Sequence, residues 1–131
     1  MTLHSILVVD DNAINLKLIS EVLEFDGYVV LKAIDAESAQ EIIRFTPPDL
    51  ILLDIALPGM DGLTLARLLK TSSKTQNIPI VALTAFAMKG DEAVAREAGC
   101  EGYITKPIDT RTLSSLVATF LDSGARHRTH Q

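Results

Sequence analysis

The chain has 131 residues, of which 47% are hydrophobic and 22% are charged, and its net charge is −5. These values are typical of one globular domain with its own core, and they exclude a disordered chain. The acidic balance excludes a basic nucleic-acid-binding surface, and no apolar run reaches the ~18 residues of a membrane span. The first residues lack the basic region of a secretory signal, and the single cysteine, Cys100, cannot form an internal disulfide. We therefore expect a cytoplasmic domain with no membrane or nucleic-acid partner.

Five short apolar runs recur along the chain, each of the length of a β-strand. They span Ile6–Val9, Val29–Ala33, Leu50–Leu53, Ile80–Leu83 and Gly102–Ile104. Three of them (I-L-V-V, L-I-L-L and I-V-A-L) are apolar at every position, which is typical of parallel strands covered on both faces.

The intervals between these runs have the periodicity of helices. We expect the helices near 13–25, 36–45, 62–71, 89–98 and 110–121, with turn residues such as Asp26-Gly27 and Pro58-Gly59 between elements. This (βα)5 order predicts an α/β fold with a doubly wound, five-stranded parallel sheet of strand order 2-1-3-4-5, as in flavodoxin-like proteins. The domain should span residues 1–122, and the polar segment 123–131 should be a flexible tail.

Polar residues follow four of the five expected strands. Asp10 and Asp11 follow the first, Asp54 the third, Thr84 the fourth and Lys106 the fifth. In a doubly wound sheet the ligand crevice lies beyond the carboxyl ends of the strands, where the strand order reverses. The first and third strands are neighbours at that point, so the sequence predicts three carboxylates in one cleft, with a hydroxyl and an ammonium opposite.

Such a cluster has a definite chemistry. Three close carboxylates need a cation if all are to stay ionised, and carboxylate oxygens together with water suit Mg²⁺. The Lys106 ammonium and the Thr84 hydroxyl are suited to the oxygens of a phosphoryl group. Asp54 could then attack phosphorus, because aspartate forms acyl phosphates.

Four motifs in the same order resemble the receiver domain of two-component response regulators. They are Asp10-Asp11-Asn12, L-I-L-L-D-I-A-L-P-G-M-D-G (50–62), A-L-T-A (82–85) and Y-I-T-K-P (103–107). The resemblance covers Ile6 to about Leu121. The segments A-F-A-M-K-G-D-E (85–92) and A-G-C-E-G-Y-I-T-K-P-I (98–108) are similar to DivK-like single-domain regulators of bacterial cell-cycle phosphorelays. The D-D-N-x-x-N start also resembles receivers attached to hybrid histidine kinases.

The resemblance implies that Asp54 is the phosphoacceptor. Asp10, Asp11, Asp54 and the backbone carbonyl of Ala56 would bind Mg²⁺. The phosphoryl group would come from a histidine kinase or a histidine phosphotransfer protein. Because we find no output domain after the last helix, the signal would pass to a downstream protein target by direct contact.

Three further residues receive roles from the same resemblance. Thr84 and Lys106 would hold the phosphoryl oxygens, and a cis Lys106–Pro107 bond would direct the ammonium towards Asp54. Tyr103 would be an aromatic switch that turns inward when the phosphoryl group draws Thr84, which is a shift between two existing states.

Two further features lead to expectations of their own. Ala56 and Phe86, at positions that flank the path of a hydrolytic water in receivers, have no polar group to orient it. We therefore expect a long-lived phospho-Asp54. The apolar arc of the helix near 13–25 is wider than a core-facing stripe needs, so Ile14 or Leu16 should stay partly exposed in a docking face for phosphotransfer proteins.

Alternatives stay open at this point. Asp10-Asp11 alone could be a turn or a helix cap, and a half-buried tyrosine is common in strands. An aspartate-dependent phosphatase would need a substrate pocket, for which the short connections offer little material. An FMN carrier would need a phosphate-binding loop where Asp10 and Asp11 stand. A receiver that works without phosphorylation would be expected to lack some of the acidic or lysine residues.

Overall fold

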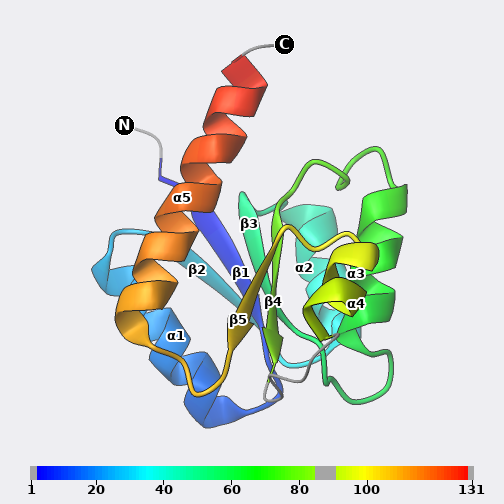
Figure 1. Cartoon of the computed structure of the whole chain (residues 1–131), viewed down its shortest axis with the longest axis horizontal. Coiled ribbons are helices and arrows are strands. Elements are labelled where there is room, and N and C mark those ends of the chain that lie inside the picture. Colours follow the sequence, from blue (N-terminus) through cyan, green and yellow to red (C-terminus); the bar gives the residue numbers. More distant parts are fainter. Residues whose placement is uncertain (1–2, 85–90, 130–131) are drawn as a thin grey trace.

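A computed structural model of the chain describes residues 3–84 and 91–129. Five parallel strands form one sheet in the order β2-β1-β3-β4-β5 (Figure 1), which confirms the predicted fold class. The strands are β1 (Ser5–Val9), β2 (Val29–Ala33), β3 (Leu50–Asp54), β4 (Ile80–Thr84) and β5 (Gly102–Thr105). The helices are α1 (Ala13–Phe25), α2 (Ala36–Phe45), α3 (Gly62–Thr71), α4 (Asp91–Glu97) and α5 (Thr110–Thr129).

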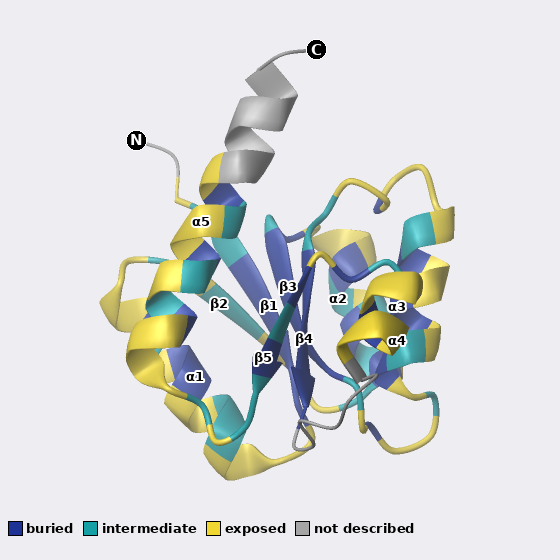
Figure 2. Cartoon of the chain, viewed as in Figure 1, coloured by how far each residue is buried: buried dark blue, intermediate teal, exposed yellow. Residues whose placement is uncertain are grey.

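The helices cover both faces of the sheet. Helices α1 and α5 lie on one face, and α2, α3 and α4 lie on the other (Figure 1). Strands β3 and β4 are buried at every position, as is β1 apart from Ser5 (Figure 2). Edge strand β2 is only partly covered. The continuous apolar runs in the sequence therefore belong to the central strands, because these contact helices on both sides.

Most element boundaries match the sequence-based expectation to within one residue, and two helices need comment. The predicted end of α5 was wrong. The apolar periodicity stops at Leu121, but the helix continues to Thr129. No proline interrupts 122–129, so a polar composition alone does not end the helix there. Helix α4 is described from Asp91, and the first residues of its expected range, 89–98, lie outside the described residues.

Short polar side chains begin three of the helices. Asn12, Asp35 and Asp61 accept hydrogen bonds from backbone N–H groups in the first turns of α1, α2 and α3. Such caps satisfy N–H groups that have no partner within the helix. Each cap is the last residue of the connection between a strand and the next helix. These connections leave the carboxyl edge of the sheet, so the three helices begin at the same edge as the predicted site.

Cys100 is buried between α4 and β5, as a small apolar residue would be. Burial, with a smaller effect of Glu101, raises the pKa of its thiol to about 11. The reactive thiolate is therefore scarce at neutral pH, which fits a packing role. None of the described helices has the length and apolar character needed to cross a membrane.

Candidate functional site

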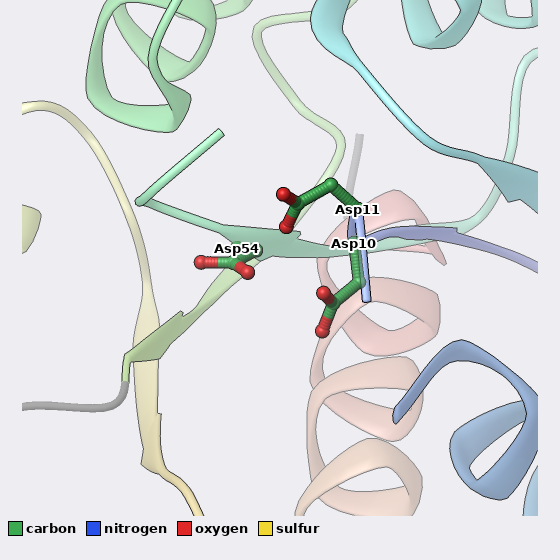
Figure 3. Close-up of side chains that lie close together, drawn as sticks. All are labelled: Asp10, Asp11 and Asp54. Atoms are coloured by element: carbon green, nitrogen blue, oxygen red, sulfur yellow. The ribbon is translucent and has the colours of Figure 1, made fainter. Parts of the chain in front are cut away.

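The sheet register places the acidic residues together. Val9 of β1 pairs with Leu53 of β3, so the residues that follow, Asp10 and Asp54, emerge side by side. Asp10, Asp11 and Asp54 each offer one carboxylate oxygen, and these oxygens lie within 4.8 Å of one another (Figure 3). Asp10 is 0% and Asp54 4% exposed, whereas Asp11 is exposed. The cluster thus has a buried base and one side open to solvent.

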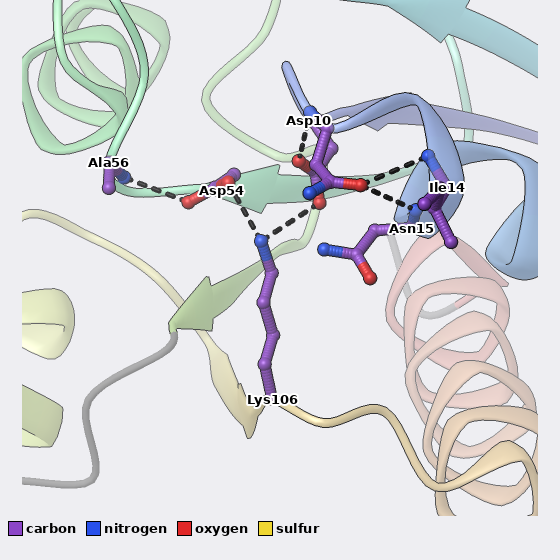
Figure 4. A network of polar contacts seen from close by, with 7 residues as sticks. Asp10, Ile14, Asn15, Asp54, Ala56 and Lys106 are labelled. Carbon is purple, nitrogen blue, oxygen red and sulfur yellow. Dashed lines mark hydrogen bonds and ion pairs between the residues drawn. The ribbon is translucent and has the colours of Figure 1, made fainter.

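Lys106 reaches the same cluster from the end of β5. Its Nζ lies 2.9 Å from Asp54 Oδ2 and 3.0 Å from Asp10 Oδ2 (Figure 4). Its backbone N–H donates to the carbonyl of Thr84, 2.6 Å away, which fixes the base of the side chain. The Lys106–Pro107 peptide bond is cis, as predicted.

Burial and charge act in opposite directions at these groups. Burial raises the pKa of Asp10, with a smaller contribution from Asp54, and the Asn12 N–H and Lys106 offset only part of this increase. Burial also lowers the pKa of Lys106, but its contacts with Asp54 and Asp10 outweigh burial and leave that pKa raised. Lys106 is therefore a protonated counter-ion to two buried carboxyl groups.

Two backbone donors complete the first contacts of these carboxylates. The Asn12 N–H donates to Asp10 Oδ1 over 2.9 Å, and the Ala56 N–H donates to Asp54 Oδ1 over 2.8 Å. In both cases the donor lies two residues after the aspartate, which is the local pattern of an Asx turn. These contacts were not predicted from the sequence, although an aspartate at a strand end is a known signal for such turns. They hold one oxygen of each carboxylate in place.

The other predicted site residues that the structure describes are Thr84, Tyr103 and Ala56. Thr84 is buried at the last position of β4. Tyr103 is half-buried on β5 and packs against the core on the side of α2, α3 and α4. Ala56 is exposed two residues after Asp54. Phe86 lies outside the described residues.

Helix α1 begins beside the cluster and has the expected exposed apolar edge. Ile14 is 79% exposed, Leu16 is half-buried against the core and Leu23 is fully buried. The excess apolar arc therefore reaches solvent in the first turn of α1, next to Asp11.

The donor set fits a hard divalent cation. Three carboxylates gather with one face open to solvent, and Mg²⁺ prefers such oxygen ligands while it keeps several waters. Asp10, Asp11 and Asp54 would hold the ion. Burial is the main cause of the raised pKa of Asp10, and a cation beside this carboxylate would favour its ionised form.

The family-model comparison matches residues 6–118 to the response regulator receiver domain. The chain belongs to this family. The matched range contains all three carboxylates, Thr84 and Lys106, so the receiver domain includes the whole cluster.

Individual relatives agree with this assignment. The polar-differentiation response regulator DivK of Brucella anthropi is 40% identical over 117 residues, which cover 89% of this chain and 95% of DivK. A response regulator structure from Chloroflexus aurantiacus has a TM-score of 0.89 at 32% identity and covers 92% of this chain and 99% of its own. This receiver is therefore DivK-like over nearly all of its length.

A third relative comes from a different type of protein. The signal receiver domain of a signal transduction histidine kinase from Syntrophus aciditrophicus has a TM-score of 0.85 at 32% identity and covers 92% of this chain and 91% of its own. Receivers of single-domain regulators and of kinases thus share this architecture.

Proposed function

We propose that the chain is a response regulator that accepts a phosphoryl group on Asp54 in a two-component phosphorelay. The observation that supports this most directly is the grouping of Asp54 with Asp10, Asp11 and Lys106 at the carboxyl edge of the sheet. An acceptor aspartate needs a fixed carboxylate and positive charge for the incoming oxygens. Both are present in one partly open site.

The reaction would follow from the contacts of Asp54. The Ala56 N–H holds Oδ1 over 2.8 Å, and Lys106 contacts Oδ2 over 2.9 Å. One carboxylate oxygen forms the new bond to phosphorus as the P–N bond of a donor phosphohistidine breaks, and the histidine nitrogen leaves with the electron pair. Lys106 then pairs with a phosphoryl oxygen instead of the carboxylate.

Metal and hydroxyl groups would complete the site. Asp10, Asp11, Asp54 and the Ala56 carbonyl would hold Mg²⁺, which supplies positive charge to the transferring oxygens. The Thr84 hydroxyl would donate to a phosphoryl oxygen. A change at Thr84 would be relayed to Tyr103, which lies half-buried on the neighbouring strand β5.

Donor and target would both be proteins. A histidine kinase or histidine phosphotransfer protein would supply the phosphoryl group, and a downstream protein would bind the phosphorylated form in the cytoplasm. We do not assign a separate enzymatic substrate. A groove of about 960 Å³ lies between α1 and α5, lined by residues such as Phe25, Tyr28 and Ser114 and by none of the clustered carboxylates.

A second candidate is a receiver that acts within a hybrid histidine kinase. The Syntrophus aciditrophicus receiver, which belongs to a histidine kinase, supports it. The chemistry at Asp54 would be the same, and the donor would then be a histidine of the same protein.

The test is labelling by a small phosphodonor. With acetyl phosphate and Mg²⁺, the intact mass of the protein should rise by one phosphoryl group, and hydroxylamine should remove it. Asp54→Asn should abolish the increase. Asp61→Asn is the matched control, because asparagine also caps helices and Asp61 contacts Thr64 of α3. An unchanged mass increase in Asp54→Asn would refute the assignment.

A further inference from the structure

Gly62, the first residue of α3, makes a very close approach to the strand that bears Asp54. A Cβ at this position would lie 2.6 Å from the Cα of Ile55 and closer still to the carbonyl oxygen of Asp54. Both neighbours are backbone atoms, so neither can move aside as a side chain could. The start of α3 therefore rests directly on the backbone of Asp54 and Ile55.

Gly59, in the same connection, shows a different requirement. Its φ is +71°, and a Cβ there would meet nothing within 4 Å. It serves a left-handed turn, for which glycine is favoured. Gly62 is not among the described residues with positive φ. Its lack of a side chain is needed for space rather than for backbone conformation.

The contact at Gly62 closes the loop that follows Asp54. The Gly62 N–H donates to the Ile55 carbonyl over 3.2 Å, so residues 56–61 form a loop whose two ends touch. Ala56 is the first residue of that loop, and its N–H holds Asp54 Oδ1 over 2.8 Å. The position of Ala56 relative to Asp54 thus depends on where α3 begins.

We propose that Gly62 is a positioning residue for the metal and phosphoacceptor site. By allowing α3 to contact the Asp54 backbone, it fixes the Ala56 N–H on the carboxylate and directs the Ala56 carbonyl to the cation. This inference rests on the proposed function, in which Asp54 is the acceptor and the Ala56 carbonyl is a ligand. A methyl group at residue 62 displaces the loop and separates these groups.

The test compares Gly62→Ala with Gly27→Ala. Gly27 lies between α1 and β2, has φ +96° and has open space at its Cβ position, so its substitution lowers stability without a clash at the site. Mg²⁺ affinity is measured by calorimetric titration, and the unfolding midpoint is measured in EDTA. Gly62→Ala should bind Mg²⁺ roughly tenfold or more weakly, since loss of supporting contacts typically costs that much. Gly27→Ala should bind it as the native protein does.

Labelling by acetyl phosphate gives a second measurement. For Gly62→Ala, the Mg²⁺ concentration that gives the half-maximal rate should rise by a similar factor, whereas for Gly27→Ala it should not change. Native Mg²⁺ affinity in Gly62→Ala, or an equal loss of affinity in Gly27→Ala, would overturn the proposal. If the native protein is not labelled at Asp54, the proposed function fails, and the titration still decides the role of Gly62.

If Gly62→Ala does not fold, the proposal can still be tested on the native protein. Mg²⁺ should shift the NMR amide resonances of Ala56 and Gly62 over the same concentration range, because the two groups belong to one closed loop. A Gly62 resonance that stays unchanged while that of Ala56 moves would also overturn the proposal.

Discussion

Lys106 shows how one residue can offset part of the charge of a carboxylate cluster. Its ammonium contacts Asp10 at 3.0 Å and Asp54 at 2.9 Å, while Asp11 stays exposed beside them. Removing one partner of a buried ion pair costs about 3–5 kcal/mol, because the other charge is left unpaired. In the proposed function an incoming cation and phosphoryl group would take over the contacts of Lys106, so no buried charge would lose its partner. In the proposed function the same residue would be the counter-ion before the reaction and a phosphoryl ligand after it.

At the residue scale, the sequence predicted the side chains of the site and missed its backbone contacts. Asp10, Asp54 and Lys106 could be grouped because each ends or follows a parallel strand and the strand order makes them neighbours. The Ala56 N–H contact and the close approach at Gly62 were missed, because an aspartate at a strand end or a glycine near a turn does not by itself show which backbone atoms it meets.

We expect the lifetime of phospho-Asp54 to depend on the residue at position 56. Ala56 is exposed next to the acceptor and has no polar group to orient a hydrolytic water. We predict that Ala56→Asn accelerates the decay of the labelled protein several-fold, as roughly 1 kcal/mol of better orientation would. Decay of the intact-mass label after removal of the donor measures this.

Ala56→Val is the matched control for size, because valine is also apolar and should not accelerate the decay. Phe86→Glu, at the second flanking position, should act in the same direction as Ala56→Asn. If neither polar variant decays faster than the native chain, side chains at these two positions do not control hydrolysis.

At the scale of elements, continuous apolar runs and helical periodicity identified strands and helices, but the end of α5 was missed. The prediction followed the apolar periodicity, which indicates only the part of a helix that packs against the core. This periodicity ends at Leu121, whereas the backbone stays helical to Thr129. A helix can extend past its contact with the sheet, so its buried length and its total length need not agree.

Helix α1 provides a prediction about donor recognition. Ile14 is 79% exposed in its first turn, next to the acidic cluster, and an exposed apolar side chain there suits a protein donor. We predict that Ile14→Gln slows phosphotransfer roughly tenfold, which is about 1.4 kcal/mol of lost contact. The donor used is the histidine kinase or phosphotransfer protein of the source organism that labels the native chain fastest.

Acetyl phosphate should label Ile14→Gln at the native rate, because a small donor needs no docking face. Phe25→Gln serves as the comparison: Phe25 is 91% exposed at the other end of the same helix, and its substitution should have a smaller effect. Native transfer rates in Ile14→Gln, or equal losses with both donors, would exclude this docking role.

At the scale of the whole molecule, the strand order explains both why the fold was predictable and why carboxylates outnumber lysines at the site. Strictly alternating strands and helices allow few arrangements, and the sheet order β2-β1-β3-β4-β5 then brings the polar strand ends together. The same arrangement buries Asp10 and Asp54 side by side with one lysine between them. Folding therefore produces an excess of negative charge at one edge of the sheet, and a cation that binds there should stabilise the entire domain.

We predict that Mg²⁺ raises the thermal unfolding midpoint and that Asp11 is required for this increase. A ligand that binds only the folded state contributes about 2.7 kcal/mol at 100 times its Kd, which is a shift of several degrees for a domain of this size. Asp11→Asn should unfold at or above the native temperature in EDTA, because Asp11 is exposed and its removal lessens repulsion among the carboxylates. The Mg²⁺-dependent increase should be much smaller in this variant and unchanged in Asp61→Asn. Melting curves with and without Mg²⁺ at equal ionic strength measure both effects, and an equal increase in native protein and Asp11→Asn would show that Mg²⁺ acts elsewhere.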